Sequence, residues 1–250
     1  NQPLCDTPLE HGFDICQFTS RSHGTSGPFR GGRKPNVPGQ NVGPSHIDGR
    51  IAIAATKNGK QLISEGPLAY VLEELGGRHS DNAMRYLQSH AADEESRKRA
   101  FFLYYPSNSN HGPHTPDSLI GDKAVVGAGK NVAGQPLNTR GDYVYENDVA
   151  LGRMLDWLEQ TDDPRSAGRK LIETTIVIFT SDNGGMFHVT GQKAWQTGHR
   201  ANGDLFGFKF GAWEGGHRVP FIVKWPKVVQ PGTVSDEPVC SIDIFPTVLE

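Results

Sequence analysis

The stretch TTIVIFTSDNGG, residues 174–185, decides how the chain is expected to fold. Its first seven residues are apolar or β-branched, which predicts a strand buried on both faces. A carboxylate, an amide and two glycines follow directly, at Asp182, Asn183, Gly184 and Gly185. Because ligands collect at the carboxyl ends of strands in open α/β sheets, this position is a candidate site.

Strand and helix patterns on both sides of this stretch indicate the fold class. Residues 101–105 (FFLYY) and 219–226 (VPFIVKWP) are predicted strands, and residues 141–160 have apolar side chains at helical spacing. The predicted apolar stripe of that helix is Val144, Leu151, Leu155 and Leu158. Strands that alternate with helices predict an α/β fold with a mostly parallel sheet flanked by helices.

The first hundred residues carry weaker signals. Residues 18–60 are rich in Gly, Pro, Ser, Asn and Arg, which predicts a loop insertion. A helix is predicted to begin near Ser64 and to end at Gly76-Gly77. Ser80 is a candidate N-cap for a second helix.

Composition excludes two classes of partner. The 250 residues have a net charge of −3 and 36% apolar content, so no basic field points to nucleic acid. No stretch approaches the roughly 20 apolar residues of a membrane span. The chain starts without Met and stops at Glu250 inside an apolar-periodic run, so we expect a piece of a longer protein.

Three polar clusters could carry chemistry, and each also has an ordinary structural interpretation. Asp182 and Asn183 offer the oxygen ligands of a hard cation, although Asp-Asn-Gly-Gly is also a favoured turn sequence. His111 and His114 could bind metal or act as a general acid, or they could be surface histidines. Lys209 could face an anionic group, or it could be a solvated lysine beside aromatic residues.

Taken together, the motifs resemble those of the sulfatase family. The match to the family's TxVIFTSDNG pattern at residues 174–185 is nearly letter for letter, and the order of the other motifs also agrees. These other motifs are HGFD (11–14), FFLYYPSNSNHGPHTP (101–116), YENDVALGRMLDWLEQ (145–160), FKFGAWEGGHRVPFIVKWP (208–226) and SDEPVCSIDIFPTVLE (235–250). The resemblance implies an alkaline phosphatase-like α/β fold, with residues 1–250 as the middle and carboxy-terminal part of the catalytic domain.

The resemblance also implies roles for individual residues. Asp182 and Asn183 match the family's ligands of a divalent cation, usually Ca²⁺. His111 matches the histidine that contacts the sulfate ester and protonates the leaving oxygen, and Lys209 matches the lysine that binds sulfate oxygens. The sequence departs from the family pattern at Phe210, where the usual residue after the lysine is Gly. That departure puts the local backbone geometry in question.

Other family features concern a helix residue and the nucleophile. Asp148 matches a structural Asp of the family's helix, which predicts a buried, hydrogen-bonded carboxylate. Sulfatases use a formylglycine made from the Cys or Ser of C/S-x-P-x-R, which lies upstream of HGFD in the family. Ser26-Gly27-Pro28-Phe29-Arg30 is a literal match, but it follows HGFD and lacks the apolar helix that should come next. We therefore expect the nucleophile outside this chain, and the 250 residues alone to be inactive.

The resemblance predicts a sulfuric ester hydrolase that acts on a sulfated small molecule or carbohydrate, in a periplasmic or secreted location. Two alternatives stay open. One is a phosphatase or phosphodiesterase of the same superfamily, which should show more Asp/His pairs after Asp182. The other is a catalytically degenerate relative that binds sulfated glycans, which an interrupted C/S-x-P-x-R motif would indicate.

Overall fold

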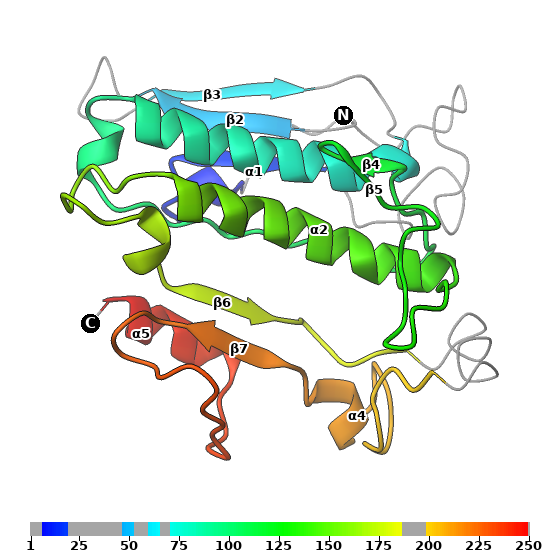
Figure 1. The fold of residues 1–250 in the computed structure, drawn as a ribbon. Coiled ribbons are helices and arrows are strands. Elements are labelled where there is room, and N and C mark those ends of the chain that lie inside the picture. The colour runs from blue at the N-terminus through cyan, green and yellow to red at the C-terminus, as the bar shows by residue number, and fades with distance from the viewer. Residues whose placement is uncertain (1–6, 20–46, 53–59, 66–70, 187–198, 250) are drawn as a thin grey trace. The chain divides into compact units, whose positions relative to one another are not determined.

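The computed structural model describes residues 7–19, 47–52, 60–65, 71–186 and 199–249. The chain divides into two compact units, Asn1–Trp157 and Leu158–Glu250, and each unit is considered by itself (Figure 1). Within the described ranges, no helix is long and apolar enough to cross a bilayer.

The first unit contains a three-stranded antiparallel sheet. Strand β1 (Ile15–Phe18) pairs with β2 (Ile47–Ala52), which in turn pairs with β3 (Lys60–Glu65). The prediction that residues 18–60 are a loop insertion is therefore wrong at residues 47–52. The rest of that prediction, at residues 20–46 and 53–59, lies outside the described residues.

Helix α1 (Leu75–Ala92) follows the 3₁₀ turn Leu72–Glu74 and runs straight through the glycine pair. The prediction that Gly76-Gly77 ends a helix was wrong, because these glycines serve close packing instead. A Cβ on Gly76 would collide with the carboxylate of Glu146 on the next helix. The missing side chains let the two segments approach each other.

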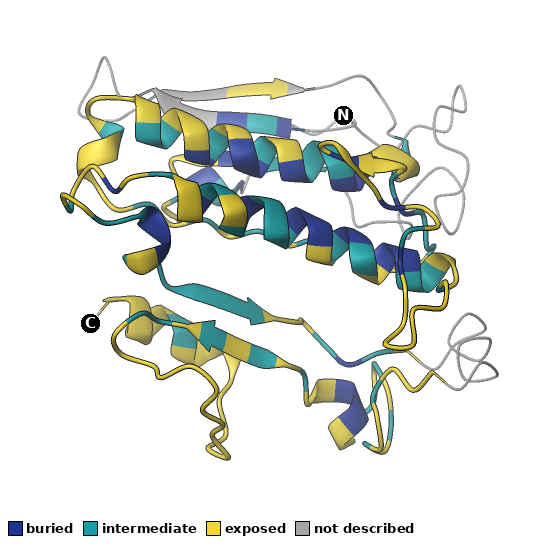
Figure 2. Ribbon diagram, viewed as in Figure 1, coloured by how far each residue is buried: buried dark blue, intermediate teal, exposed yellow. Residues whose placement is uncertain are grey.

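Helix α2 (Thr139–Gln160) confirms the predicted helix over residues 141–160 and lies beside α1 (Figure 1). Met154 of α2 packs against Met84 and Leu87 of α1. The buried positions of α2 repeat every three or four residues, and Figure 2 shows them on α2. They are Asp142, Tyr143, Glu146, Val149, Ala150, Met154 and Leu158. Of the predicted stripe, Leu158 is confirmed as buried and Leu151 and Leu155 are half-buried, but Val144 was wrong, since it is 47% exposed.

Residues 101–105 are extended but form no strand ladder with any part of the described chain. Their side chains alternate as in a strand: Phe101, Leu103 and Tyr105 pack against the core, while Phe102 and Tyr104 are exposed. The strand prediction is thus wrong as to pairing, although the alternation of faces is present. A short hairpin of β4 (Leu119–Ile120) and β5 (Lys123–Ala124) follows the next loop.

The second unit is built around one strand pair. Strand β6 (Val177–Thr180) pairs with β7 (Phe221–Lys224) in antiparallel register. The helices are the short α4 (Glu214–His217) and, after a 3₁₀ turn at Ser241–Asp243, α5 (Ile244–Leu249); a further 3₁₀ turn, Leu171–Glu173, precedes β6. All strand pairs among the described residues are antiparallel, so the predicted mostly parallel sheet is not found there.

Candidate functional site

The loop Asn110–His114 lies in the first unit, after the extended segment. His111 is exposed, and its backbone amide donates a 3.0 Å hydrogen bond to the carbonyl of Asn108. Its Nδ1 donates to the carbonyl of Gly112 at 2.8 Å. Because the carbonyl takes the hydrogen of Nδ1, a proton given to a leaving group would come from Nε2.

Asn108 is held by side chains from both helices. Its Nδ2 donates to the hydroxyl of Tyr143 on α2 at 2.7 Å, and its Oδ1 accepts from Nδ1 of His79 on α1 at 3.1 Å. Tyr143 is fully buried, and burial lowers the pKa of His79. These two hydrogen bonds fix Asn108, whose backbone carbonyl in turn accepts the hydrogen bond from the His111 amide.

A buried carboxylate ties together the two ends of this loop. Glu146 is 1% exposed; its Oε1 accepts from the hydroxyl of Ser109 at 2.5 Å, and its Oε2 accepts from the amide of Asp117 at 2.6 Å. Burial raises the pKa of Glu146, while these two hydrogen bonds lower it. Ser109 and Asp117 flank the segment that carries His111 and His114, which we call the histidine loop. Glu146 therefore fixes the distance between the two ends of this loop.

The sequence pointed to the wrong acidic residue on this helix. Asp148 was predicted to be buried and hydrogen-bonded, but it is exposed. The buried carboxylate belongs to Glu146, two positions earlier, because the buried stripe passes through that position. Local spacing does not distinguish the two acidic residues, because each has apolar residues both three and four positions away.

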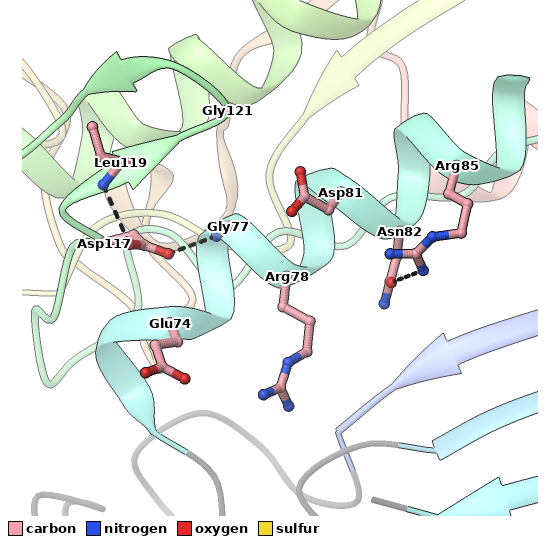
Figure 3. Close-up of a pocket in the computed structure, with 9 residues that line it drawn as sticks. All are labelled: Glu74, Gly77, Arg78, Asp81, Asn82, Arg85, Asp117, Leu119 and Gly121. Atoms are coloured by element: carbon pink, nitrogen blue, oxygen red, sulfur yellow. Dashed lines mark hydrogen bonds between the residues drawn. The ribbon is translucent and has the colours of Figure 1, made fainter.

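Asp117 extends the same network to a polar pocket on α1. Its Oδ2 accepts from the amide of Gly77 at 3.0 Å and its Oδ1 from the amide of Leu119 at 3.3 Å, as Figure 3 shows. The pocket has a volume of about 410 Å³ and charged side chains of both signs. Its other lining residues are Glu74, Arg78, Asp81, Asn82, Arg85 and Gly121. None of the predicted site residues lines it.

The His114 ring, at the end of the loop, lies near the guanidinium of Arg140. The His114 ring meets Tyr143 edge-on, with 6.3 Å between centroids. Burial, with the nearby charges of Arg140 and His111, lowers the pKa of His114 to about 4. Burial also lowers the pKa of Arg140, and its Nη1 is buried without a hydrogen-bond partner among the described residues. A buried guanidinium nitrogen in this state fits an anionic partner.

The SDNGG turn in the second unit presents oxygen atoms. Asp182 is exposed, and its carboxylate accepts one long hydrogen bond, 3.5 Å from the hydroxyl of Ser181. Asn183 donates through Nδ2 to the carbonyl of Gly184 at 3.0 Å, so its Oδ1 is directed elsewhere. A carboxylate with an amide oxygen is a donor set that suits a hard divalent cation.

Backbone contacts join this turn to the segment around Lys209. The amide of Gly184 donates to the carbonyl of Gly216 at 2.9 Å, and the amide of Lys209 donates to the carbonyl of Gly185 at 3.0 Å. A Cβ on Gly184 would collide with the carbonyl oxygen of Gly215. The glycines of both motifs therefore permit an approach that places Lys209 next to the Asp182-Asn183 turn.

Asn202 strengthens this junction, and sequence reasoning missed it. Its Oδ1 accepts from the amide of Gly185 at 2.7 Å, and its Nδ2 donates to the carbonyls of Gly185 (3.1 Å) and Gly207 (3.0 Å). One amide side chain thus connects the turn with the loop before Lys209. No motif marked this residue, because its role depends on backbone groups distant in sequence.

The family model described as Sulfatase matches residues 25–250. The chain belongs to the sulfatase family. This assignment confirms the resemblance seen in the motifs and supports the alkaline phosphatase-like α/β class, although the described strand pairs are antiparallel.

Individual sulfatases align with large parts of the chain. Mouse steryl-sulfatase (Mus musculus) is 33% identical over 190 residues, which cover 75% of this chain and 26% of that protein. Human arylsulfatase H is 39% identical over 155 residues, or 62% and 24% of the two chains. An N-acetylgalactosamine-6-O-sulfatase of Bacteroides thetaiotaomicron is 30% identical over 162 residues, or 64% and 27%. The chain therefore spans about a quarter of the length of these curated relatives.

In this sulfatase chain the predicted site residues fall into two groups. Asp182, Asn183 and Lys209 are brought together within the second unit, while His111 belongs to the first unit. Within the described ranges, no group of three or more His, Cys, Asp and Glu residues is arranged to hold a metal ion. Ser26 lies outside the described residues.

Proposed function

We propose that the full-length protein is a sulfuric ester hydrolase whose divalent cation, Ca²⁺ by family resemblance, is bound in part by Asp182 and Asn183. Lys209 binds the sulfate oxygens, and His111 protonates the leaving oxygen. The nucleophile is a formylglycine outside the 250 residues. The chain alone is inactive, because it lacks that nucleophile and supplies only two of the about 6–8 oxygen ligands that Ca²⁺ takes.

The junction between the SDNGG turn and the lysine loop carries this proposal. The hydrogen bond from the Lys209 amide to the Gly185 carbonyl joins the predicted anion ligand to the predicted metal ligands. A cation bound there would withdraw negative charge from the sulfate group. The ammonium of Lys209 would neutralise oxygens of a sulfate group bound beside the same turn. This interaction would strengthen as negative charge develops on the substrate in the transition state.

On the first unit, the histidine loop supplies the acid. The Gly112 carbonyl orients the ring of His111 through Nδ1, and a protonated Nε2 would then be directed to the leaving oxygen. The Nη1 of Arg140, which has no hydrogen-bond partner in the described part of the chain, further supports an anionic substrate at this loop. These features favour an ester of a small anionic group over a neutral substrate.

The test uses the full-length protein and 4-nitrophenyl sulfate. Lys209→Ala should lower kcat/KM by about 10²–10³, as expected for the loss of one charge-stabilising group. Lys227→Ala removes a lysine elsewhere in the same unit and should leave kcat/KM within about twofold. If the wild-type protein binds sulfated glycans but hydrolyses no sulfate ester, the degenerate-relative alternative replaces this proposal.

Metal binding has its own readout. Ca²⁺ added to the metal-free full-length protein should raise the Tm, since a ligand that binds only the folded state stabilises it. Asp182→Ala should remove most of this rise, whereas Asp204→Ala should leave it intact. An unchanged Ca²⁺-dependent rise in the Asp182 variant would exclude this turn as the metal site.

A further inference from the structure

Phe210 adopts a backbone conformation that suits glycine. Its φ is +76°, in the left-handed region that L-residues with a Cβ rarely occupy. Among the described residues, only Lys227 shares this property, with a φ of +69°. Strained backbone conformations of this kind tend to persist where a side chain has a function.

The ring of Phe210 is not stabilised by burial. The residue is 82% exposed, so the packing of this chain does not offset its unfavourable backbone. The ring does lie close to the predicted sulfate ligand, since Nζ of Lys209 is 5.5 Å from the ring centroid. The conformation thus presents an aromatic surface next to a cation.

Other exposed aromatic side chains lie within four residues of the same lysine in sequence. Phe206 and Trp213 are 71% and 63% exposed, and their rings meet edge-on with 5.1 Å between centroids. Phe208, on the other side of the lysine in sequence, is 43% exposed. An exposed aromatic ring beside a cation, in a segment rich in exposed aromatic residues, suits a ligand with an anionic end and a flat apolar body.

We propose that Phe210 is a specificity-determining residue, against which the organic group of the sulfate ester stacks while Lys209 holds the sulfate. This inference rests on the proposed hydrolase function and adds the class of ester. The preferred substrate carries its sulfate on a ring with a flat apolar face, either an aryl ring or a pyranose. A small alkyl sulfate has no such face and gains nothing from Phe210.

The test variant is Phe210→Gly in the full-length protein. Glycine adopts a φ of +76° without strain, so the variant should fold and its Tm should rise by about 1–4 °C. The KM for the preferred ring substrate, 4-nitrophenyl sulfate or glucose 6-sulfate, should rise about three- to tenfold, the range expected for one lost aromatic stack. Because the stack is present in both the ground state and the transition state, kcat should change by less than about twofold.

Lys227→Gly is the matched control. It relieves a left-handed residue of the same unit, so its Tm should also rise, while every KM should stay within about twofold of wild type. A rise in KM in both variants would show that backbone relief alone alters the site, and that result would overturn the inference.

Three substrates decide the class of ring. If Phe210→Gly raises the KM for 4-nitrophenyl sulfate, the stacked group is an aryl ring. If it raises the KM for glucose 6-sulfate, the stacked group is a pyranose. The KM for methyl sulfate should not change. The inference is overturned if neither ring substrate changes, or if methyl sulfate changes as much as they do. If wild type hydrolyses none of the three, the proposed function fails as well; normal turnover with an unchanged KM in Phe210→Gly refutes only the stacking.

Discussion

Two loops carry the predicted site residues, and they are held in place by different means. The histidine loop of the first unit is fixed by side chains, above all by the buried carboxylate of Glu146. The SDNGG turn of the second unit is fixed by backbone hydrogen bonds at Gly184 and Gly185, with the side-chain amide of Asn202 as the added support. The first loop therefore depends on side-chain polarity and protonation, whereas the second depends on the absence of side chains.

This difference predicts which substitutions each loop tolerates. A buried carboxylate that accepts two hydrogen bonds leaves buried donors without partners when it is removed. A glycine in close contact with another backbone has no polar group to lose, but it cannot accept a methyl group without movement. Comparing the two kinds of change in the same protein would separate these means of support.

The largest effect is expected for Glu146→Ala. The change leaves the Ser109 hydroxyl and the Asp117 amide without their acceptor and opens a cavity in the core. We expect a loss of about 3–5 kcal/mol in the free energy of unfolding, measured by urea denaturation of the full-length protein. Turnover should also fall, because the loop that carries His111 loses one of its links to α2 and keeps the one from Asn108 to Tyr143.

Asp148→Ala is the control for that variant, since it removes an exposed carboxylate from the same helix. Asp148→Ala should change the free energy of unfolding by less than about 0.5 kcal/mol. Glu146→Gln keeps the shape of the side chain but places its NH₂ group opposite either the Ser109 hydroxyl or the Asp117 amide, both of which are donors. The free energy of unfolding should therefore fall by about 1–3 kcal/mol. Equal losses in the Glu146 and Asp148 variants would contradict the role given to burial.

A smaller effect is expected for Gly184→Ala. The added Cβ would collide with the carbonyl oxygen of Gly215, so the turn must separate from the lysine loop. Because Gly184 is buried and the added methyl group must displace backbone, we expect a loss of about 1–3 kcal/mol in stability. The value of kcat/KM should fall as well, since Lys209 is positioned through Gly185.

Gly112→Ala makes the same substitution in the histidine loop. A Cβ at Gly112 meets nothing within 4 Å, so stability should change by less than about 0.5 kcal/mol. If both alanine variants were equally stable, close backbone packing would not be what holds the SDNGG turn.

Local sequence signals predicted several features of this molecule. The helix over residues 141–160 followed from its periodicity, and the turn after β6 followed from its residue types. Family motifs predicted that Lys209 and Asp182 serve one site, and this stays a prediction. The hydrogen bond between the Lys209 amide and the Gly185 carbonyl was beyond such reasoning, because it joins backbone groups that no residue type marks.

The failures share a physical cause. Gly76-Gly77 has the composition of a helix end, yet it lies inside α1 because Glu146 and Asp117 approach it from other segments. The same long-range packing decides which acidic residue of α2 is buried. In residues 101–105 the strand propensity is real, but a ladder needs a partner strand, and the described residues provide none.

The smallest effect concerns pH and again separates the two loops. The pKa of His114 is lowered to about 4, below the roughly 6.5 of an exposed histidine. Between these values the unfolded chain binds a proton that the folded chain does not, so stability falls as the pH drops from about 6.5 to 4. Because the ring is partly exposed, this contribution should be about 1 kcal/mol.

His114→Gln should flatten the dependence of Tm on pH across that window. The protection factors of amides in the histidine loop, which are corrected for intrinsic exchange, should fall at acid pH, while those of Gly184 and Gly185, held by a backbone carbonyl and the side-chain amide of Asn202, should not change. Equal acid sensitivity of both loops would refute this difference.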